Sequence, residues 1–422
     1  MTVRTGSRAR PRIGWTGAVA IASVLAFSLT GCRGPAQGGA SGSAAPGITD
    51  TSITLGITTP LSGGTAGPGT CTVAGVKAYF GAKNAEGGVK FGDGKTRKVE
   101  IKTYDDAYDP QKSLANFQQM TSDGVFAETS GLGTPTNRAF REAAISQKVP
   151  QALVMTGDPL FSNRQESPWQ LGLVPIYQNE GAAFGKLLAD SGGTHKVAIL
   201  SQNDDYGKGY VAGFKDAVKG ASGISIVGEQ TYEATDTSVD AQITQLASSK
   251  ADVLVNAMSV TPLAISALQK AQQIGWKPTW FLPSNTSSPT AILQPGGAAA
   301  YPGIYSVAFA KAPQSPAFAK DPDVVKFLAD LKQYGNYNDT PAFPHCMWSY
   351  ISGATLEKAF STMTEPTRDN FMSALKNIKG FRAPLMLEGT QVDTTMEGQP
   401  AISSVIVQKY NGKGYATAEK FD

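Results

Sequence analysis

The sequence contains few of the side chains on which most catalytic and metal sites depend. It has three cysteines and two histidines, and Cys71 and Cys346 lie far apart in the chain. This spacing excludes a CxxC redox motif and a cysteine-rich zinc site. The Gly-x-Ser-x-Gly, HExxH and phosphate-loop motifs are also missing from the sequence. These absences argue against an enzyme, and we expect neither a metal nor a cofactor.

Net charge is nearly absent once the opening segment is set aside. The chain has 37 basic and 34 acidic residues, and Arg4, Arg8, Arg10 and Arg12 belong to the opening segment. Residues 32–422 therefore hold 33 basic and 34 acidic residues. A nucleic-acid-binding protein needs a basic face, so we expect no nucleic-acid partner.

The first 31 residues are typical of a secretory signal. Arginines are followed by an apolar stretch from Ile13 to Leu29 and then by Thr30-Gly31-Cys32. This ending resembles a bacterial lipobox, in which a peptidase cuts before a diacylated cysteine. We expect residues 1–31 to be an export signal and Cys32 to be the lipidated first residue of the mature protein. A retained signal-anchor helix and a signal cut elsewhere are the alternatives, although the run is short for a spanning helix.

Residues 33–48 are almost all Gly, Ala, Ser and Pro, which predicts a flexible tether. Two acyl chains hold a protein stably at a membrane. After residue 31, no apolar run approaches the roughly 20 residues that a membrane span needs. We therefore expect an extracytoplasmic protein that is attached to the cell membrane by the lipid on Cys32 alone.

From residue 51, strand-like and helix-like segments alternate, and a second such series begins after Trp169. This alternation predicts βαβ units and mostly parallel sheets. We expect an α/β fold with two doubly wound lobes, joined by a multi-strand hinge and separated by a ligand cleft. The predicted first lobe comprises residues 49–173 and 301–382, and the second comprises residues 174–300 and 383–422.

Five segments in the same order resemble the leucine/isoleucine/valine-binding family of type I solute-binding proteins, the receptors of ABC importers. They are ITLGITTPLSGG with GVKAYFGAKNAEGGV, then YDDAYDPQKSLANFQQM, GLGTPTN, NDDYGKGYVAGFKDAV and DVLVNAMSVTPLAISALQKAQQIG. The resemblance extends over residues 51–410. It implies a binding protein that captures a small solute without chemistry.

Candidate ligand contacts in the first lobe follow predicted strands, because ligands of parallel sheets sit outside the carboxyl ends of the strands. Thr134 has the position of a helix N-cap. The resemblance implies that it also binds a ligand carboxylate, which helix-start amides favour. Thr156 and Gly157 fit a similar role. Asp158 does not fit, because it would repel a carboxylate; either it caps a helix or the ligand presents a donor there.

The resemblance implies four contacts in the second lobe. Tyr177 has a position that often faces the cleft, and Tyr206 matches an aromatic residue that packs on the ligand; both also suit half-buried packing. Ser259 lies where amino-acid binders carry tyrosines, and Asn285 lies where they place a glutamate for the ammonium group. An amide replaces that carboxylate weakly. The candidate ligands therefore remain an amino acid, another carboxylate, an amide or urea-like compound, and an aromatic acid.

Cys71 and Cys346 both lie near the start of predicted helices of the first lobe. This placement favours a long-range disulfide over two buried free thiols, and both alternatives remain open. His345 adjoins Cys346, but neighbouring residues do not face each other on a helix, so a Cys-His pair is not expected to act in catalysis.

The sequence thus predicts a monomeric, lipid-anchored receptor that captures a small polar solute by lobe closure and delivers it to the permease subunits of an ABC importer. A ligand-sensing lipoprotein that acts on a signalling partner is the alternative, since its fold and cleft would be the same.

Overall fold

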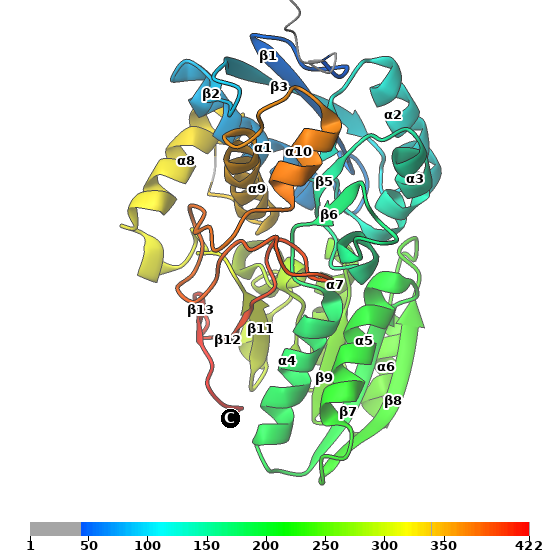
Figure 1. Ribbon diagram of the computed structural model, residues 1–422. Helices are drawn as coiled ribbons and strands as arrows, with labels where there is room; N and C mark the ends of the chain where they lie inside the picture. Colours follow the sequence, from blue (N-terminus) through cyan, green and yellow to red (C-terminus); the bar gives the residue numbers. More distant parts are fainter. Residues whose placement is uncertain (1–43, 339, 422) are drawn as a thin grey trace, which may run out of the picture. The chain divides into compact units, whose positions relative to one another are not determined.

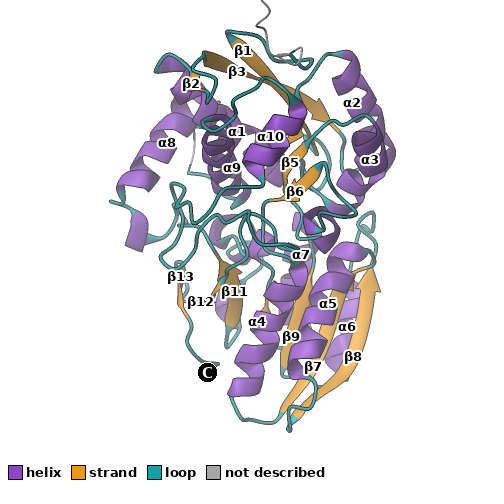
Figure 2. Ribbon diagram, in the orientation of Figure 1, coloured by secondary structure: helices purple, strands orange, loops and turns teal. Residues whose placement is uncertain are grey.

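The computed structural model describes residues 44–338 and 340–421. The predicted export signal, Cys32 and most of the tether lie outside these residues. The described chain forms two sheets with helices packed on both faces of each (Figures 1 and 2). The predicted α/β fold with two parallel-sheet lobes is confirmed.

The first lobe contains a six-stranded sheet in the order β2-β3-β1-β4-β5-β6, in which β2 alone is antiparallel to its neighbour. Its elements are β1 (Ser52–Thr59), α1 (Ala66–Ala85), β2 (Val89–Lys90), β3 (Thr96–Asp105), α2 (Pro110–Ser122), β4 (Ala127–Thr129), α3 (Thr134–Ser146), β5 (Gln151–Val154), the 3₁₀ turn η1 (Pro159–Ser162), β6 (Gln170–Gly172), the 3₁₀ turn η5 (Pro316–Phe318), α8 (Pro322–Tyr334), α9 (His345–Phe360) and α10 (Arg368–Leu375).

The second lobe contains a seven-stranded sheet in the order β13-β12-β11-β10-β9-β7-β8, in which β12 and β13 are antiparallel. Its elements are α4 (Tyr177–Asp190), β7 (His195–Gln202), α5 (Asp205–Val218), β8 (Ile224–Tyr232), α6 (Asp240–Ser248), β9 (Val253–Ala257), α7 (Thr261–Gln273), β10 (Thr279–Phe281), the short turns η2 (Ser284–Thr286), η3 (Pro289–Leu293) and η4 (Ala298–Ala300), β11 (Ile304–Ala308), β12 (Ile406–Tyr410) and β13 (Tyr415–Thr417).

The start of α2 illustrates how local sequence determines these elements. The Asp109 carboxylate accepts hydrogen bonds from the backbone N–H groups of Gln111 at 2.7 Å and Lys112 at 3.2 Å. Pro110 occupies the first helical position, where no intrahelical N–H is needed. An Asp followed by Pro is thus sufficient to start this helix.

Helix α9 is the central helix of the first lobe. Nearly all of its residues are buried, and it packs against α1. Gly75 of α1 permits this packing, because a Cβ atom there would overlap Ser349 and the backbone of Cys346. An apolar surface on every side of a helix is typical of such a buried position.

Hydrogen bonds tie together the segments that cross between the lobes. The segment after β6 pairs with the segment that precedes β12, since the Ile402 amide donates to the Leu173 carbonyl at 2.9 Å. The segment after β11 pairs with the segment that follows α10, since the Lys311 amide donates to the Leu385 carbonyl at 2.7 Å. The predicted multi-strand hinge is therefore built from segments that are distant in sequence.

Two of the predicted lobe boundaries differ from the structure. Strand β11 was expected in the first lobe but pairs with β10 in the second sheet. Residues 383–402 were expected in the second lobe, but Leu385, Val392 and Ile402 are buried in the core of the first. The alternation pattern could not indicate these boundaries, because they depend on which sheet each crossing segment joins.

Within the described residues, no helix combines the length and the apolar character needed to cross a membrane.

A disulfide joins Cys71 of α1 to Cys346 of α9, whose Cα atoms lie 4.3 Å apart. Both residues are fully buried, and 275 residues separate them in sequence. A cross-link over a long loop restricts the unfolded chain and so stabilises the folded state.

We expect the double variant Cys71→Ala, Cys346→Ala to lose about 2–5 kcal/mol of unfolding free energy, because the unfolded chain regains loop entropy. Denaturant titration measures this change. Reducing the unaltered protein should lower its stability similarly and should leave the variant unchanged. An unaltered protein whose stability does not respond to a reductant would contradict the disulfide.

Candidate functional site

A cavity lies between the two lobes and surrounds about 530 Å³ of space that protein atoms do not fill. Most of its wall comes from loops and helix starts that follow strands. Five predicted contacts line it, namely Thr134, Tyr177, Tyr206, Ser259 and Asn285. Pro68 also lines it. The wall further contains residues that the sequence did not single out as ligand contacts, including Tyr108, Glu180, Tyr210, Ser284, His345 and Trp348.

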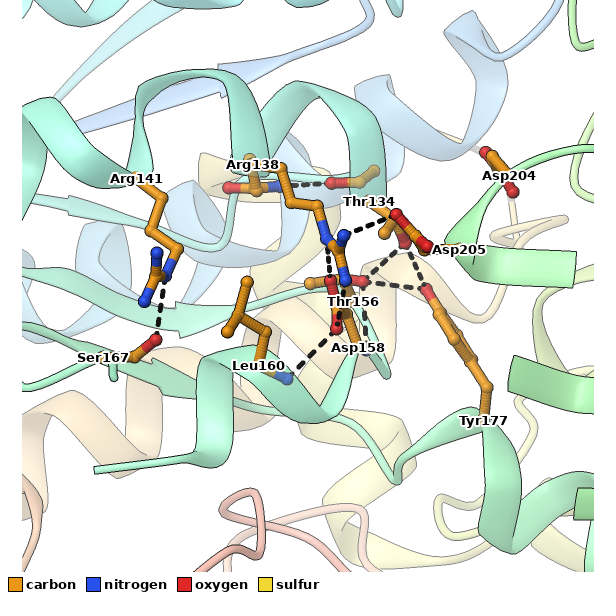
Figure 3. Close-up of polar contacts among 12 residues, drawn as sticks. Thr134, Arg138, Arg141, Thr156, Asp158, Leu160, Ser167, Tyr177, Asp204 and Asp205 are labelled. Carbon is orange, nitrogen blue, oxygen red and sulfur yellow. Dashed lines mark hydrogen bonds and ion pairs between the residues drawn. The ribbon is translucent and has the colours of Figure 1, made fainter. Parts of the chain in front are cut away.

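Three hydroxyl groups meet beside this cavity (Figure 3); Thr134 and Tyr177 line it, whereas Thr156, also predicted as a contact, does not. The Thr134 Oγ1 atom lies 2.7 Å from Thr156 Oγ1 and 3.0 Å from the Tyr177 Oη atom, and Thr156 Oγ1 lies 2.9 Å from the same Tyr177 oxygen. The two threonines belong to the first lobe and Tyr177 begins α4 of the second. We call these three residues the hydroxyl cluster; it links the lobes.

The hydroxyl cluster lies at the start of α3. Thr134 was expected to be the N-cap, but the structure makes Gly133 the cap and Thr134 the first helical residue. Gly133 has a φ of 112°, a conformation that favours glycine, and provides no capping side chain. The Thr134 side chain is consequently available to the hydroxyl cluster. Helix-start amides beside hydroxyl donors suit an anionic group.

Gly157 lines no part of the cavity but lets the second lobe approach. A Cβ atom on Gly157 would meet the Pro175 carbonyl oxygen and, at 2.6 Å, the Tyr177 ring. The Gly157 carbonyl also accepts a hydrogen bond from the Tyr177 amide at 2.9 Å. Gly157, which was predicted as a ligand contact, therefore contributes to the site indirectly, because it lets Tyr177 of the second lobe pack against the first lobe.

Asp158 does not line the cavity and instead pairs with Arg138 (Figure 3). Its carboxylate accepts from the Leu160 amide at 3.1 Å, as an N-cap of η1 does, and from Arg138 Nε at 2.5 Å. Of the two roles that the sequence left open for Asp158, the cap agrees with the structure. A direct ligand contact does not agree with it, because the Asp158 carboxylate is already bonded to Arg138 and to the Leu160 amide.

Arg138 also reaches across the cleft. Its Nη1 atom lies 2.5 Å from the carboxylate of Asp205, at the start of α5 in the second lobe. One guanidinium thus bridges a buried carboxylate of the first lobe and a half-exposed carboxylate of the second. Figure 3 shows Arg138 between Asp158 and Asp205, whereas Arg141 turns toward Ser167 within its own lobe. The sequence analysis did not identify this bridge.

Tyr206 and Asn285 touch each other in the second lobe. The Tyr206 hydroxyl lies 3.0 Å from Asn285 Oδ1 and 2.9 Å from the Met258 carbonyl. Ser259 donates to the Gln202 side chain at 2.6 Å. The rings of Tyr177, Tyr206 and Tyr210 pack together with centroids 4.8 to 5.1 Å apart. These tyrosines combine packing with cavity lining, so the two roles weighed for Tyr177 and Tyr206 are compatible.

Glu180, in the first turn of α4, is the acidic residue on the cavity wall. Its carboxylate accepts from Tyr210 Oη at 2.8 Å, from Ser284 Oγ at 2.8 Å and from the Ser284 amide at 3.1 Å. Burial raises the pKa of Glu180 although these donors favour the ionised form. An acidic residue in the first turn of a helix is common, because it stabilises the positive end of the helix dipole. The position of Glu180 in the sequence therefore gave no sign that its carboxylate is buried.

Tyr108 reaches the cavity from a tight turn after β3. Ala107 and Tyr108 have positive φ values of 50° and 64°. The turn is stabilised by Asp106, which accepts from the Tyr108 amide at 2.9 Å and from the Thr58 hydroxyl at 3.0 Å. Burial raises the pKa of Asp106 to about 6. These bonds give Asp106 a structural role in the turn.

His345 and Trp348 form the wall at the start of α9, with ring centroids 4.7 Å apart. The His345 Nδ1 atom is buried and has no hydrogen-bond partner among the described residues. Burial lowers the pKa of His345 from 6.5 to about 3, so the ring is neutral at pH 7. Among residues 44–338 and 340–421, no lysine or arginine lines the cavity. Within the described residues, no cluster of three His, Cys, Asp or Glu side chains is arranged to hold a metal ion.

Acid should destabilise the protein partly through His345. Between pH 6.5 and about 3 the unfolded chain binds a proton that the folded His345 does not. The stability present above pH 6.5 should therefore fall by up to about 1.4 kcal/mol per pH unit on acidification. Unfolding free energies measured against pH should show a shallower loss in His345→Phe. Equal slopes for the protein and the variant would contradict this role.

Comparisons with known proteins agree with this architecture. A model of the periplasmic binding protein family matches residues 52–415. The Leu/Ile/Val-binding protein homolog 3 of Brucella melitensis is 27% identical over 212 residues, which are 48% of this chain and 53% of that protein. The chain thus spans about half the length of the curated relatives it matches.

Solved structures share the fold at low identity. A branched-chain amino acid ABC transporter protein from Thermus thermophilus with bound valine has a TM-score of 0.76 at 14% identity, covering 88% of this chain and 97% of that one. A fatty acid ABC transporter substrate-binding protein from Thermomonospora curvata has a TM-score of 0.74 at 21% identity, covering 89% and 95%. Because the family model matches most of the chain and the two-lobed fold accompanies it, the protein belongs to the periplasmic binding protein family.

Proposed function

We propose that this protein is the solute receptor of an ABC importer, anchored outside the cytoplasm by a lipid on Cys32, and that it works as a monomer. It binds a small solute carrying a carboxylate or amide in the cavity between its lobes and delivers that solute to membrane permease subunits. The observation that carries the proposal is that side chains of both lobes form one cavity wall and also bond to each other around it.

The cavity wall supports a solute with one polar end and an apolar remainder. The hydroxyl cluster and the start of α3 provide donors for a carboxylate. Leu132, Met155 and Val174 provide apolar surface on the wall. The names of the curated relatives, which refer to leucine, isoleucine and valine, point to the same kind of solute.

Asn285 and Glu180 bear on whether the solute is an α-amino acid. Asn285 offers an amide where a carboxylate would best hold an ammonium group. Glu180 supplies a carboxylate on the same wall, with three protein donors already bonded to it. An ammonium group would therefore meet Glu180 in place of Asn285.

Closure requires that the ligand prefers the closed form, because a ligand shifts a conformational equilibrium only by its differential affinity. Contacts made with both lobes at once exist only in the closed form. The bridge from Arg138 to Asp205 adds a contact of the same kind outside the cavity. The lipid on Cys32 and the Gly/Ser-rich tether would then keep the closed receptor at a high effective concentration near its permease.

A solute screen tests this function. We expect a thermal-shift screen of amino acids, their deaminated analogues, amides and aromatic acids to yield a ligand that raises the melting temperature by mass action. The same ligand should reduce the radius of gyration in small-angle scattering. Thr156→Val should weaken its binding by about 1 kcal/mol, since a hydroxyl partner is lost. A ligand that binds without changing lobe separation would overturn the closure mechanism.

The Arg138 bridge leads to a separate prediction. Asp205→Asn removes the ion pair between Arg138 and Asp205 across the cleft and leaves the Arg138–Asp158 pair intact. Since Arg138 and Asp205 are 37% and 45% exposed, we expect a loss of about 0.2–1 kcal/mol, which is at most about fivefold in affinity. The loss should appear as faster ligand dissociation and should fade at high salt.

Asp216→Asn is the matched control for Asp205→Asn, because it removes the same charge from the other end of α5. We expect the dissociation rate of this control to equal that of the unaltered protein. Equal dissociation rates for Asp205→Asn and Asp216→Asn would show that the bridge does not contribute to the closed form.

A further inference from the structure

A second cavity adjoins the cleft at the hinge and surrounds about 460 Å³. We call it the side cavity. It shares two residues with the main cavity, Ser284 of the second lobe and Trp348 of the first. The rest of its wall comes from the end of β11 and the segment that follows it, the loop before α9 and the first turn of α9, the segment after η2, and Gln408 of β12 and Tyr415 of β13. The space between the lobes therefore continues on the far side of Trp348.

Apart from Gln408, the polar side chains on the wall of the side cavity are already bonded to protein. Ser287 Oγ donates to the Ser284 carbonyl at 2.9 Å, and Tyr415 Oη donates to the Ser287 carbonyl at 2.8 Å. Ser288 and Gln314 donate to backbone carbonyls of the loop before α9. A polar solute would find few open partners here, and polar groups without partners are costly to bury.

Apolar side chains supply much of the remaining wall. They are Pro289, Val307, Phe309, Ala310, Met347 and Trp348, and no charged side chain lines this cavity. Such a wall favours hydrocarbon, because transferring apolar surface out of water is favourable in proportion to its area.

Trp348 lies between the two cavities and lines both of them. Its ring stacks on Phe309 at a centroid distance of 5.2 Å and touches His345. Ser284, opposite, is held by its two bonds to Glu180. A chain that extends from the main cavity into the side cavity therefore has to pass between the Trp348 ring and Ser284.

Together the two cavities have a polar end and an apolar end. The hydroxyl cluster and the start of α3 lie on the wall of the main cavity, and the side cavity begins at Trp348. We propose that the ligand is an amphipathic acid whose carboxylate binds at the hydroxyl cluster and whose apolar tail passes Trp348 into the side cavity. This inference rests on the proposed function and names the solute class. A compact amino acid would occupy the main cavity alone.

Calorimetry with a homologous series of straight-chain monocarboxylates, from acetate to decanoate, tests the tail site. The secreted chain with Cys32→Ala is used, so that no detergent competes for the acids. Once a tail is long enough to reach past Trp348, each added methylene should tighten binding about fourfold. Short acids that bind without any gain on lengthening would overturn the tail site and leave the proposed function standing.

Ala342→Phe places an aromatic ring at the side cavity from a loop position that is partly exposed. We expect it to abolish the gain for long acids and to leave the affinity for short acids unchanged. Ala319→Phe, at an exposed position that lines neither cavity, is the matched control and should retain the full gain. An equal gain in both variants would place the tail elsewhere and overturn the proposal.

A second measurement locates the tail. An acid brominated near the end of its chain should quench tryptophan fluorescence in the unaltered protein and much less in Trp348→Phe. If no acid of the series binds, the amphipathic-acid assignment is wrong. The proposed function itself fails only if the broader solute screen also finds neither a ligand nor closure.

Discussion

The carboxyl ends of parallel strands meet at one edge of a sheet, and the site of this protein depends on that constraint. Tyr108 follows β3, Thr134 begins the helix after β4, and Thr156 lies just after β5. In the second lobe, Tyr206 follows β7 and Asn285 follows β10. Each lobe alone offers one wall of the cavity. In the closure mechanism proposed above, a ligand that contacts both walls would favour closure only by the amount by which it binds the closed form more tightly.

The closed cleft already satisfies much of its own hydrogen bonding. The hydroxyls of Thr134, Thr156 and Tyr177 bond to one another, and Glu180 has three donors. A ligand carboxylate at the hydroxyl cluster exchanges these bonds for its own, so the net gain per bond is small. Apolar contact must then supply a large share of the affinity. Selectivity would come from shape and from groups that are costly to leave unpaired.

Within the described residues, the wall of the main cavity contains no positively charged side chain. His345 is neutral because burial lowers its pKa to about 3, and Arg138 is occupied by Asp158 and Asp205 outside the cavity. An anionic group would thus be held by dipoles and hydroxyl donors at the start of α3, without a full counter-charge on the wall. Such an arrangement holds a ligand while still allowing its release, since no buried ion pair has to be broken. A charged Arg partner would add the desolvation cost of a second ion.

Local patterns determined much of the fold. The alternation of strand-like and helix-like segments corresponds to the alternating strands and helices of both lobes, because apolar periodicity and strand composition act over neighbouring residues. Strand β11 and helix α10 were not identified. The lobe membership of residues 383–402 was also missed, since a crossing segment has no local signal for the sheet it will join.

For the site, the sequence by itself identified the loops after strands and four of the hydroxyl and aromatic residues on the cavity wall, Thr134, Tyr177, Tyr206 and Ser259, because parallel topology converts order along the chain into position at the strand ends. Only the tertiary structure decided which partners those residues find. Asp158 pairs with Arg138, Arg138 reaches Asp205 of the other lobe, and Glu180 bonds to Ser284, 104 residues further along the chain. These pairings depend on how closely and in which orientation distant segments pack, both within a lobe and across the hinge. No pattern within one segment determines that packing.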